Sequence, residues 1–250
     1  MTKEFWIKKC QGWKNKWPVF QPDYENKKDG INIYKFIECL NHSLKESATV
    51  VSDAGSSLYA CAQGLKLKDT QRWICSWAQS QMGAAISMSC GVCFAKNKEE
   101  TIVIVGDGSF HTQVNALATI KYFNLPIKIF ILQNNGYLSI KNTQDKFYEG
   151  RRIGTDSNDG IFFPKIEDIS KAYQIKYLKI AAEDNIDERI QEILSLNCPI
   201  ICEIICPELQ EIIPCMMIKK DKFGNSLQPD ISDMYPYLTD EDYNAEMIKN

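Results

Sequence analysis

The stretch that decides the fold is residues 101–105 (TIVIV), followed at once by Gly106-Asp107-Gly108-Ser109. A run of β-branched and apolar residues predicts a strand buried on both faces, as strands of parallel sheets are. The glycine-flanked aspartate predicts a tight turn directly after this strand. Because open α/β sheets bind ligands at the carboxyl ends of their strands, this turn is a candidate binding site.

A second strand and a second polar turn follow farther along the chain. Residues 126–132 (PIKIFIL) predict another buried strand, with Asn134-Asn135-Gly136 after it. Glycines permit a close approach of the backbone to a phosphate. A helix predicted to begin near Phe110 would direct its amide groups to the same place. Together the two turns predict a phosphate site, whereas either alone is more typical of an ordinary tight turn or hairpin.

The oxygen atoms of these turns also predict a magnesium site. Asp107 and Asn134 offer side-chain oxygens, and the carbonyl of Gly136 can add a third ligand. Diphosphate oxygens and a water would complete the octahedral coordination that Mg²⁺ prefers. The cation would let a carboxylate and a diphosphate share one pocket without repelling each other.

Helical and strand patterns alternate along the rest of the chain. The expected helices include residues 33–40, 82–95, 110–118 and 186–194. The further expected strands are residues 49–52, 73–76 and 199–205, and residues 148–164 are expected to form a long loop. This alternation predicts the α/β class, with a doubly wound, mainly parallel sheet and helices on both faces.

Three segments are expected along the 250 residues. Residues 1–30 are expected to form an irregular N-terminal arm or linker, because Pro18, Pro22 and Gly30 break any period, with tryptophans that dock on a neighbour. Residues 31–210 are expected to form the binding domain. Residues 211–250 are expected to form an acidic C-terminal tail.

The composition excludes several classes of protein. Charged residues make up 24% of the chain and the net charge is −3, so no basic excess points to nucleic acid or an anionic membrane surface. No apolar run approaches the ~18–20 residues of a membrane span. The ten cysteines, without an export signal, predict reduced thiols in the cytoplasm. Only two histidines are present, which excludes a histidine-rich metal site.

The GDG motif followed by NN at this spacing is that of thiamin diphosphate enzymes. The chain resembles the C-terminal, diphosphate-binding domain of the acetolactate synthase-like members, from about Asn32 to the tail. The resemblance implies thiamin diphosphate and Mg²⁺ as cofactors, with the metal on Asp107, Asn134 and Gly136. The cofactor-binding residues that it implies are Ser56, Ser57, Ser80, Met82, Gly106, Gly108, Ser109, Asn134 and Gly136.

Two of these positions concern the shape of the cofactor. Residues 76–83 (SWAQSQMG) resemble the segment under the thiazolium ring. There Met82 matches the large apolar residue that bends the cofactor, and Ser80 matches the position whose carbonyl accepts from its 4′-amino group. Ser56 and Ser57 stand where many synthases have Gln-His, a departure that bears on the acetolactate reaction itself.

The resemblance also implies that half of the active site lies elsewhere. The family's catalytic glutamate comes from a separate pyrimidine-binding domain, supplied by another copy or a second subunit, and we expect no catalytic residue in this chain. The implied substrate is a small 2-oxo acid such as pyruvate, and decarboxylation and carboligation both stay open. So do three explanations of the chain: one subunit of a split enzyme, a gene fragment, or a non-catalytic cofactor-binding or assembly protein.

Other chemistry-bearing residues have plainer interpretations. Cys90 and Cys93 form a CxxC without a second pair or a nearby histidine, which favours packing in the core. His111 is interpreted either as a residue beside the phosphates or as a substrate contact. Tyr137 and Leu138 are candidates for lining the substrate side.

Overall fold

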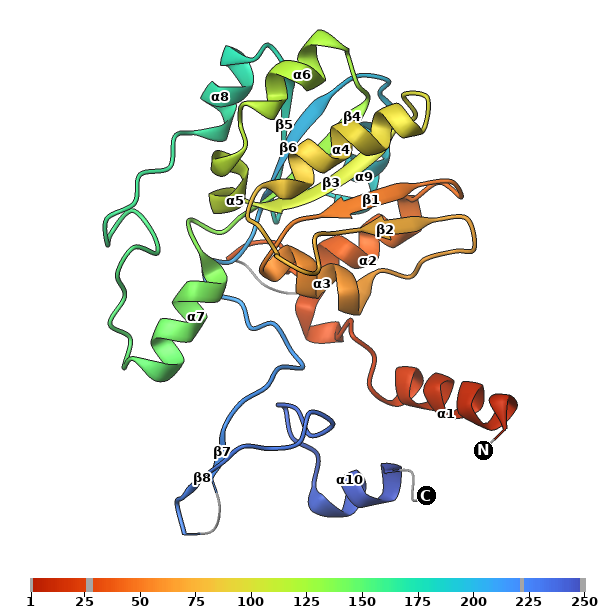
Figure 1. Ribbon diagram of the computed structural model, residues 1–250, viewed down its shortest axis with the longest axis vertical. Coiled ribbons are helices and arrows are strands. Elements are labelled where there is room, and N and C mark those ends of the chain that lie inside the picture. Colours follow the sequence, from red (N-terminus) through yellow and green to blue (C-terminus); the bar gives the residue numbers. More distant parts are fainter. Residues whose placement is uncertain (1, 26–28, 221–222, 248–250) are drawn as a thin grey trace. The chain divides into compact units, whose positions relative to one another are not determined.

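The apolar strands assemble into one parallel sheet in the computed structural model (Figure 1). The structure describes residues 2–25, 29–220 and 223–247, and it divides into two units, Met1–Gln210 and Glu211–Asn250. The strands of the first unit are β1 (Thr49–Ser52), β2 (Arg72–Ile74), β3 (Thr101–Gly106), β4 (Ile127–Gln133), β5 (Lys176–Ile180) and β6 (Ile200–Ile205). They pair in the order β2-β1-β3-β4-β6-β5, and every pairing is parallel.

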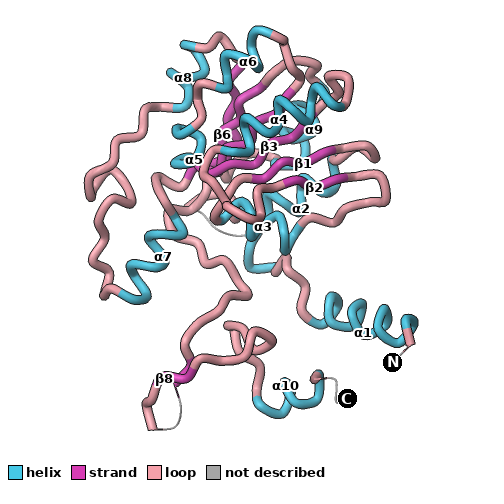
Figure 2. Tube along the Cα trace, in the orientation of Figure 1, coloured by secondary structure: helices cyan, strands magenta, loops and turns pink. Residues whose placement is uncertain are grey.

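Helices cover both faces of this sheet (Figures 1 and 2). The helices of the first unit are α1 (Lys3–Lys16), which does not cover the sheet, α2 (Ile33–Ser43), α3 (Ser56–Gly64), α4 (Ala84–Ala95), α5 (Asp107–Thr112), α6 (Ala116–Tyr122), α7 (Leu138–Phe147), α8 (Ile166–Ala172) and α9 (Ile186–Ser195), with a 3₁₀ turn at Pro22–Glu25. The α/β class predicted from the alternating pattern is therefore confirmed.

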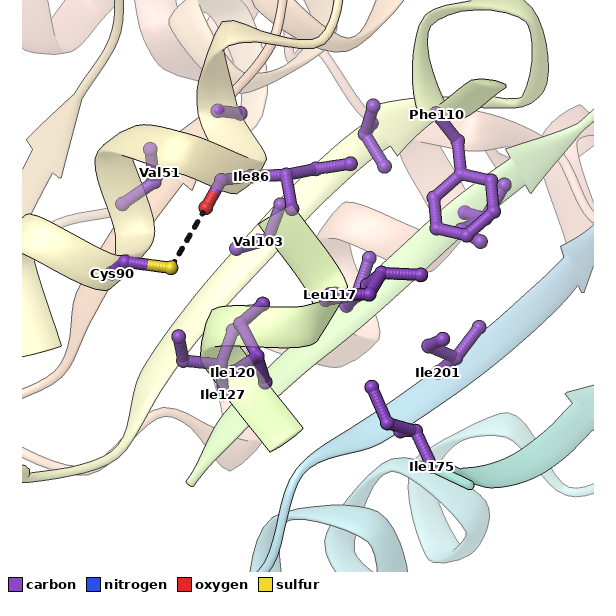
Figure 3. Packing of buried hydrophobic residues seen from close by; sticks show 14 of the residues in the cluster. Val51, Ile86, Cys90, Val103, Phe110, Leu117, Ile120, Ile127, Ile175 and Ile201 are labelled. Atoms are coloured by element: carbon purple, nitrogen blue, oxygen red, sulfur yellow. Dashed lines mark hydrogen bonds between the residues drawn. The ribbon is translucent and has the colours of Figure 1, made fainter. Parts of the chain in front are cut away.

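Alternation along the central strands explains why two helical layers are needed. Val103 of β3 packs with Ile86 of α4 and Leu117 of α6 in one buried cluster (Figure 3). Successive side chains of a strand point to opposite faces, so the neighbours of these strand residues need a second cover. The Phe130 ring of β4 lies 5.3 Å, between centroids, from Phe36 of α2.

The N-terminal arm corrects one expectation. Residues 1–30 are not irregular throughout, because α1 occupies Lys3–Lys16 and its first turn is capped by Thr2, whose Oγ1 accepts from the amide of Phe5 at 3.3 Å. Pro18, the first helix-breaking proline, lies beyond Lys16, so it limits the helix without preventing it. No residue of α1 is buried, and residues 26–28 of the arm lie outside the described residues.

The periodicity of apolar residues predicted the buried faces of helices better than it predicted where the helices begin and end. The single helix expected over residues 110–118 is two short helices, α5 and α6, because the chain leaves helical geometry at Gln113. Phe110 and Leu117 nevertheless pack into the same cluster, as the spacing predicted. The pattern also missed α7, α8 and β5, whose sequences are short or polar. Residues 148–164 contain no helix or strand, in agreement with the expected loop.

The second unit is small. Strands β7 (Lys219–Lys220) and β8 (Ser226–Leu227) pair antiparallel, and α10 (Asp240–Glu246) is capped by the Thr239 side chain. Lys219 forms an ion pair with Asp233 within this unit. Nowhere in the described part of either unit is a helix long and apolar enough to cross a membrane.

The central strand β4 offers a test of this core. Ile129 is 1% exposed, so Ile129→Ala should lower the free energy of unfolding by about 2–5 kcal/mol through lost burial and an unfilled cavity. Urea denaturation measures this loss. The matched control is Ile153→Ala, at a side chain that is 78% exposed, which should change stability by less than about 0.5 kcal/mol. Equal effects of the two variants would contradict the buried register of β4.

Candidate functional site

The carboxylate of Asp107 is the centre of the candidate site. It lies at the carboxyl end of β3 and is 2% exposed. One oxygen accepts from the amide of Gly108 at 2.7 Å, and the other accepts from the amides of Asn134 at 3.2 Å and Gly136 at 2.9 Å. The predicted turn is the junction of strand and helix, because α5 begins at Asp107 itself and not near Phe110. This single side chain therefore joins the turn after β3, which is the first turn of α5, to the turn after β4.

The charge of Asp107 is costly where it stands. Burial raises the pKa of this carboxyl to about 6, although the three amides and the nearby Lys141 ammonium oppose the rise. A buried carboxylate whose pKa stays raised despite such donors lacks sufficient positive charge around it. A divalent cation at this position would supply that charge.

Asn134 presents an oxygen that has nothing to bind. Its side chain is 4% exposed, and Oδ1 has no hydrogen-bond partner among the described residues. Buried polar atoms almost always have a hydrogen-bond partner. An amide oxygen without one is therefore available to bind a group such as a metal ion. Asn134 and Asp107 line the same pocket, in which the orphaned oxygen and the carboxylate could bind a hard cation together.

Glycines shape the walls of this pocket. A Cβ on Gly108 would lie 2.1 Å from the ring of Tyr137, so only glycine leaves room for that ring. Gly136 has a φ of +142°, and a Cβ there would lie 2.3 Å from the carbonyl oxygen of Thr155. Both turns are thus closed by contacts that any side chain would break.

Asp53 ties a third segment to the site. It follows β1, it is 3% exposed, and its carboxylate accepts from the amides of Gly83 at 2.9 Å and Ala85 at 3.1 Å. The Thr112 hydroxyl lies 2.9 Å from the Met82 carbonyl and 2.7 Å from the Ser109 carbonyl, so its one proton bridges the Met82 segment and α5. These two contacts position Met82 over the pocket.

The pocket brings together nearly all of the residues singled out from the sequence. Those that line it are Ser56, Ser57, Met82, Gly106, Asp107, Gly108, Ser109, Asn134 and Gly136. Ser80 is not among the lining residues; it lies in the loop before Met82 with a φ of +49°, and its amide donates to the Ser76 carbonyl. Tyr137 and Leu138, candidates from the sequence, also line the pocket.

The serines after β1 are not equivalent. The Ser57 hydroxyl is buried and donates to the carbonyl of Ala54 at 2.9 Å, so only its lone pairs are left for a ligand. The Oγ of Ser56 lies 3.5 Å from that of Ser139, which also lines the pocket. Ser56 and Ser139 are therefore better placed than Ser57 to donate to a phosphate, and Ser139 had no signal in the sequence.

Sequence reasoning also missed a buried ion pair behind the second turn. Lys141 of α7 and Asp156 of the long loop lie 2.9 Å apart, with side chains only 1% and 9% exposed. A lysine on a short polar helix gives no sign that it is buried. Its role becomes visible only in the structure, from its burial and from its contact with a residue fifteen positions later.

The remaining candidates, His111 and the two cysteines, lie outside the residues that line the pocket. The half-buried ring of His111 stacks on Phe163 at 5.4 Å between centroids, and burial lowers its pKa. The thiols of Cys90 and Cys93 are buried in α4, in agreement with core packing, and burial raises the pKa of Cys90 to about 11. Within the described residues, no group of three His, Cys, Asp or Glu side chains could hold a metal ion.

Comparison with known proteins decides the family. The family model described as "Thiamine pyrophosphate enzyme, C-terminal TPP binding domain" matches residues 53–204. The chain belongs to this family. The matched range contains both turns, Asp53 and Met82, so the pocket lies inside the thiamin diphosphate-binding domain of the family. The resemblance seen in the sequence is thereby confirmed.

Relatives agree with this assignment. Acetolactate synthase 2, chloroplastic, of Nicotiana tabacum is 28% identical over 190 residues, which cover 74% of this chain and 29% of that protein. Acetolactate synthase 1, chloroplastic, of Zea mays is 26% identical over 199 residues, 78% of this chain and 31% of that protein. The chain thus spans less than a third of the length of these relatives. The cytoplasmic location expected from the cysteines stays a prediction.

A solved structure supports the fold. The thiamine diphosphate-dependent 4-hydroxybenzoylformate decarboxylase of Rhodococcus jostii RHA1 matches with a TM-score of 0.63 at 20% identity, over 73% of this chain and 34% of that chain. At this identity the match concerns the fold alone.

The raised pKa of Asp107 gives a pH-dependent prediction for the protein without metal. The folded carboxyl has a pKa of about 6, above the ~3.9 of an unfolded aspartate, so the folded state binds the proton more tightly. This group's contribution to the free energy of unfolding therefore falls as the pH rises from about 4 to about 6, and it is lost above that pH. The difference between wild type and Asp107→Asn should be about 1.4 kcal/mol more favourable to wild type at pH 5 than at pH 8.

Urea denaturation in a chelating buffer at the two pH values measures this difference. A difference that stays constant, or that changes in the other direction, would show that the Asp107 carboxyl is not buried in the way described.

Proposed function

We propose that this chain is the diphosphate- and Mg²⁺-binding half of a thiamin diphosphate-dependent 2-oxo acid decarboxylase or carboligase of the acetolactate synthase type. The observation that carries the proposal is the orphaned Oδ1 of Asn134, in a residue that lines the same pocket as the buried carboxylate of Asp107. Both are hard oxygen donors, and the family to which the chain belongs binds a diphosphate.

The residues present fit both groups. Asp107, Asn134 and the carbonyl of Gly136 would hold the metal, and this carbonyl, which accepts from the Leu138 amide at 3.1 Å, keeps a second lone pair. The metal would offset the charge that makes Asp107 costly to bury. Around it, Gly106, Gly108, Ser109 and the serines after β1 would bind the diphosphate.

The chemistry divides between the cofactor and the chain. When bound, thiamin diphosphate supplies the electron sink for cleavage next to a carbonyl. This chain's residues orient it: Asp53 and Thr112 hold the Met82 segment, so that the Met82 side chain, 37% exposed in this structure, can support a bent cofactor, with the Ser80 carbonyl as its proposed acceptor. Tyr137 closes the pocket wall beside Gly108.

A partner is part of the proposal. None of the pocket-lining residues is a glutamate, and the chain covers less than a third of its relatives. We therefore place the catalytic glutamate on a separate pyrimidine-binding domain. The same lack of a glutamate favours the second candidate, a non-catalytic protein that binds the cofactor for assembly.

The metal site can be tested by replacing its unpartnered oxygen. Asn134→Ala should abolish Mg²⁺-dependent binding of thiamin diphosphate, measured by calorimetry, because it removes a ligand. It should leave the unfolding free energy of the metal-free protein nearly unchanged, because Oδ1 makes no hydrogen bond there. Asp107→Ala should abolish binding too. Unchanged affinity in Asn134→Ala would reject the site.

The missing half can be tested by native mass spectrometry. The tagged chain, purified from its own cells with thiamin diphosphate and Mg²⁺, should appear in a complex with a second, different chain that carries a pyrimidine-binding domain. A lone chain or a homodimer would contradict the split enzyme and favour a fragment or a non-catalytic binder.

A further inference from the structure

The peptide between Asn135 and Gly136 is held at both ends by buried charges. Its carbonyl accepts from the Nζ of Lys141 at 2.9 Å. Its N–H, on Gly136, donates to the carboxylate of Asp107 at 2.9 Å. This peptide lies in the second turn between the two groups proposed as metal ligands, the Asn134 side chain and the Gly136 carbonyl, and its N–H binds the third, the Asp107 carboxylate. A rotation of its plane would break both contacts at once and release the Asp107 carboxylate from the second turn at Gly136.

Lys141 acts from behind the turn. Its side chain is 1% exposed and it is not among the residues that line the pocket, so it does not reach a ligand there. Its ammonium is fixed by the carboxylate of Asp156, 2.9 Å away, and this ammonium holds the pKa of Asp156 below its usual value. A buried ion pair adds little net stability, because removing two charges from water costs about as much as their attraction returns.

A tight turn in the long loop, residues 148–164, holds Asp156 in place. The carboxylate of Asp159 accepts from the amides of Thr155 at 2.6 Å and of Asp156 at 2.8 Å, which closes a tight turn. The Thr155 carbonyl then accepts from the amide of Tyr137 at 2.9 Å. The loop thus contacts the second turn twice, through a backbone hydrogen bond and through Lys141.

We propose that Lys141, fixed by Asp156, is a positioning residue that orients the Asn135–Gly136 peptide for metal binding. The inference rests on the proposed function, because it concerns the same metal site. Residues that orient metal ligands from behind typically change affinity about 10–100-fold when they are replaced.

The experiment compares two buried lysines of the same protein. Lys141→Met is the test, and Lys128→Met is the matched control. Lys128 lies at the opposite end of β4, is fully buried, and donates to the carbonyls of Leu196 and Cys198. Both variants lose a buried ammonium that binds backbone carbonyls, but only Lys141 contacts the metal turn.

Mg²⁺-dependent binding of thiamin diphosphate is measured by calorimetry, and stability by urea denaturation. Lys141→Met should weaken binding at least about tenfold, whereas Lys128→Met should lose stability with unchanged affinity. Lys141→Arg, which keeps the charge, should recover part of the binding. Equal affinities of Lys141→Met and wild type, or equal losses in both methionine variants, would overturn the inference.

A double variant separates positioning from stability and covers the case in which Lys141→Met does not fold. Lys141→Met with Asp156→Asn removes both charges of the ion pair, so the unfolding free energy should recover relative to Lys141→Met, in which the Asp156 carboxylate is left without its partner. Binding should stay weak, because the Asn135 carbonyl is still not held. Recovery of both properties would show a merely structural role. If wild type itself shows no metal-dependent binding, the proposed function fails, which is a different result.

Discussion

The rest of the site depends on one buried carboxylate, which accepts hydrogen bonds from backbone amides of two separate turns. Asp107 closes its own turn through Gly108 and draws in the next one through Asn134 and Gly136. The two strands that lead into these turns are adjacent in the sheet, so parallel pairing delivers both turns to one edge. The sheet brings the two turns close together, and the Asp107 carboxylate then holds them by hydrogen bonds.

The surrounding backbone offsets part of the cost of burying this carboxylate. Asp107 keeps a raised pKa because water is excluded, yet three amides and Lys141 oppose its protonation. A group balanced in this way gains more from a cation than a fully paired aspartate would. Asp53 shows the contrasting case, since its carboxylate serves to hold the backbone at Gly83 and Ala85. Two aspartates after neighbouring strands thus take different parts, one facing the proposed metal and one supporting the segment around Met82.

Local sequence signals explain what could be predicted. The runs at β3 and β4 are apolar and continuous, so the strands and the turns after them followed directly from pattern and motif. The helix α1 and the break at Gln113 did not, because prolines mark where a helix stops and periodicity does not show where one bends. Lys141 and Asp156 could not be predicted either, since each looks like a solvated surface charge until the loop returns to α7. Ser139 is a similar case, one turn beyond the motif.

The order of the strands bears on how the chain could release a ligand. The two turns follow the third and fourth of six strands, β3 and β4, which have neighbours on both sides. Edge strands and chain ends open most readily in native proteins, and central strands open last, close to global unfolding. Amide hydrogen exchange in β3 and β4 is then expected to be among the slowest in the domain. A ligand held there would leave by the mouth of the pocket, and not by fraying of the scaffold beneath it.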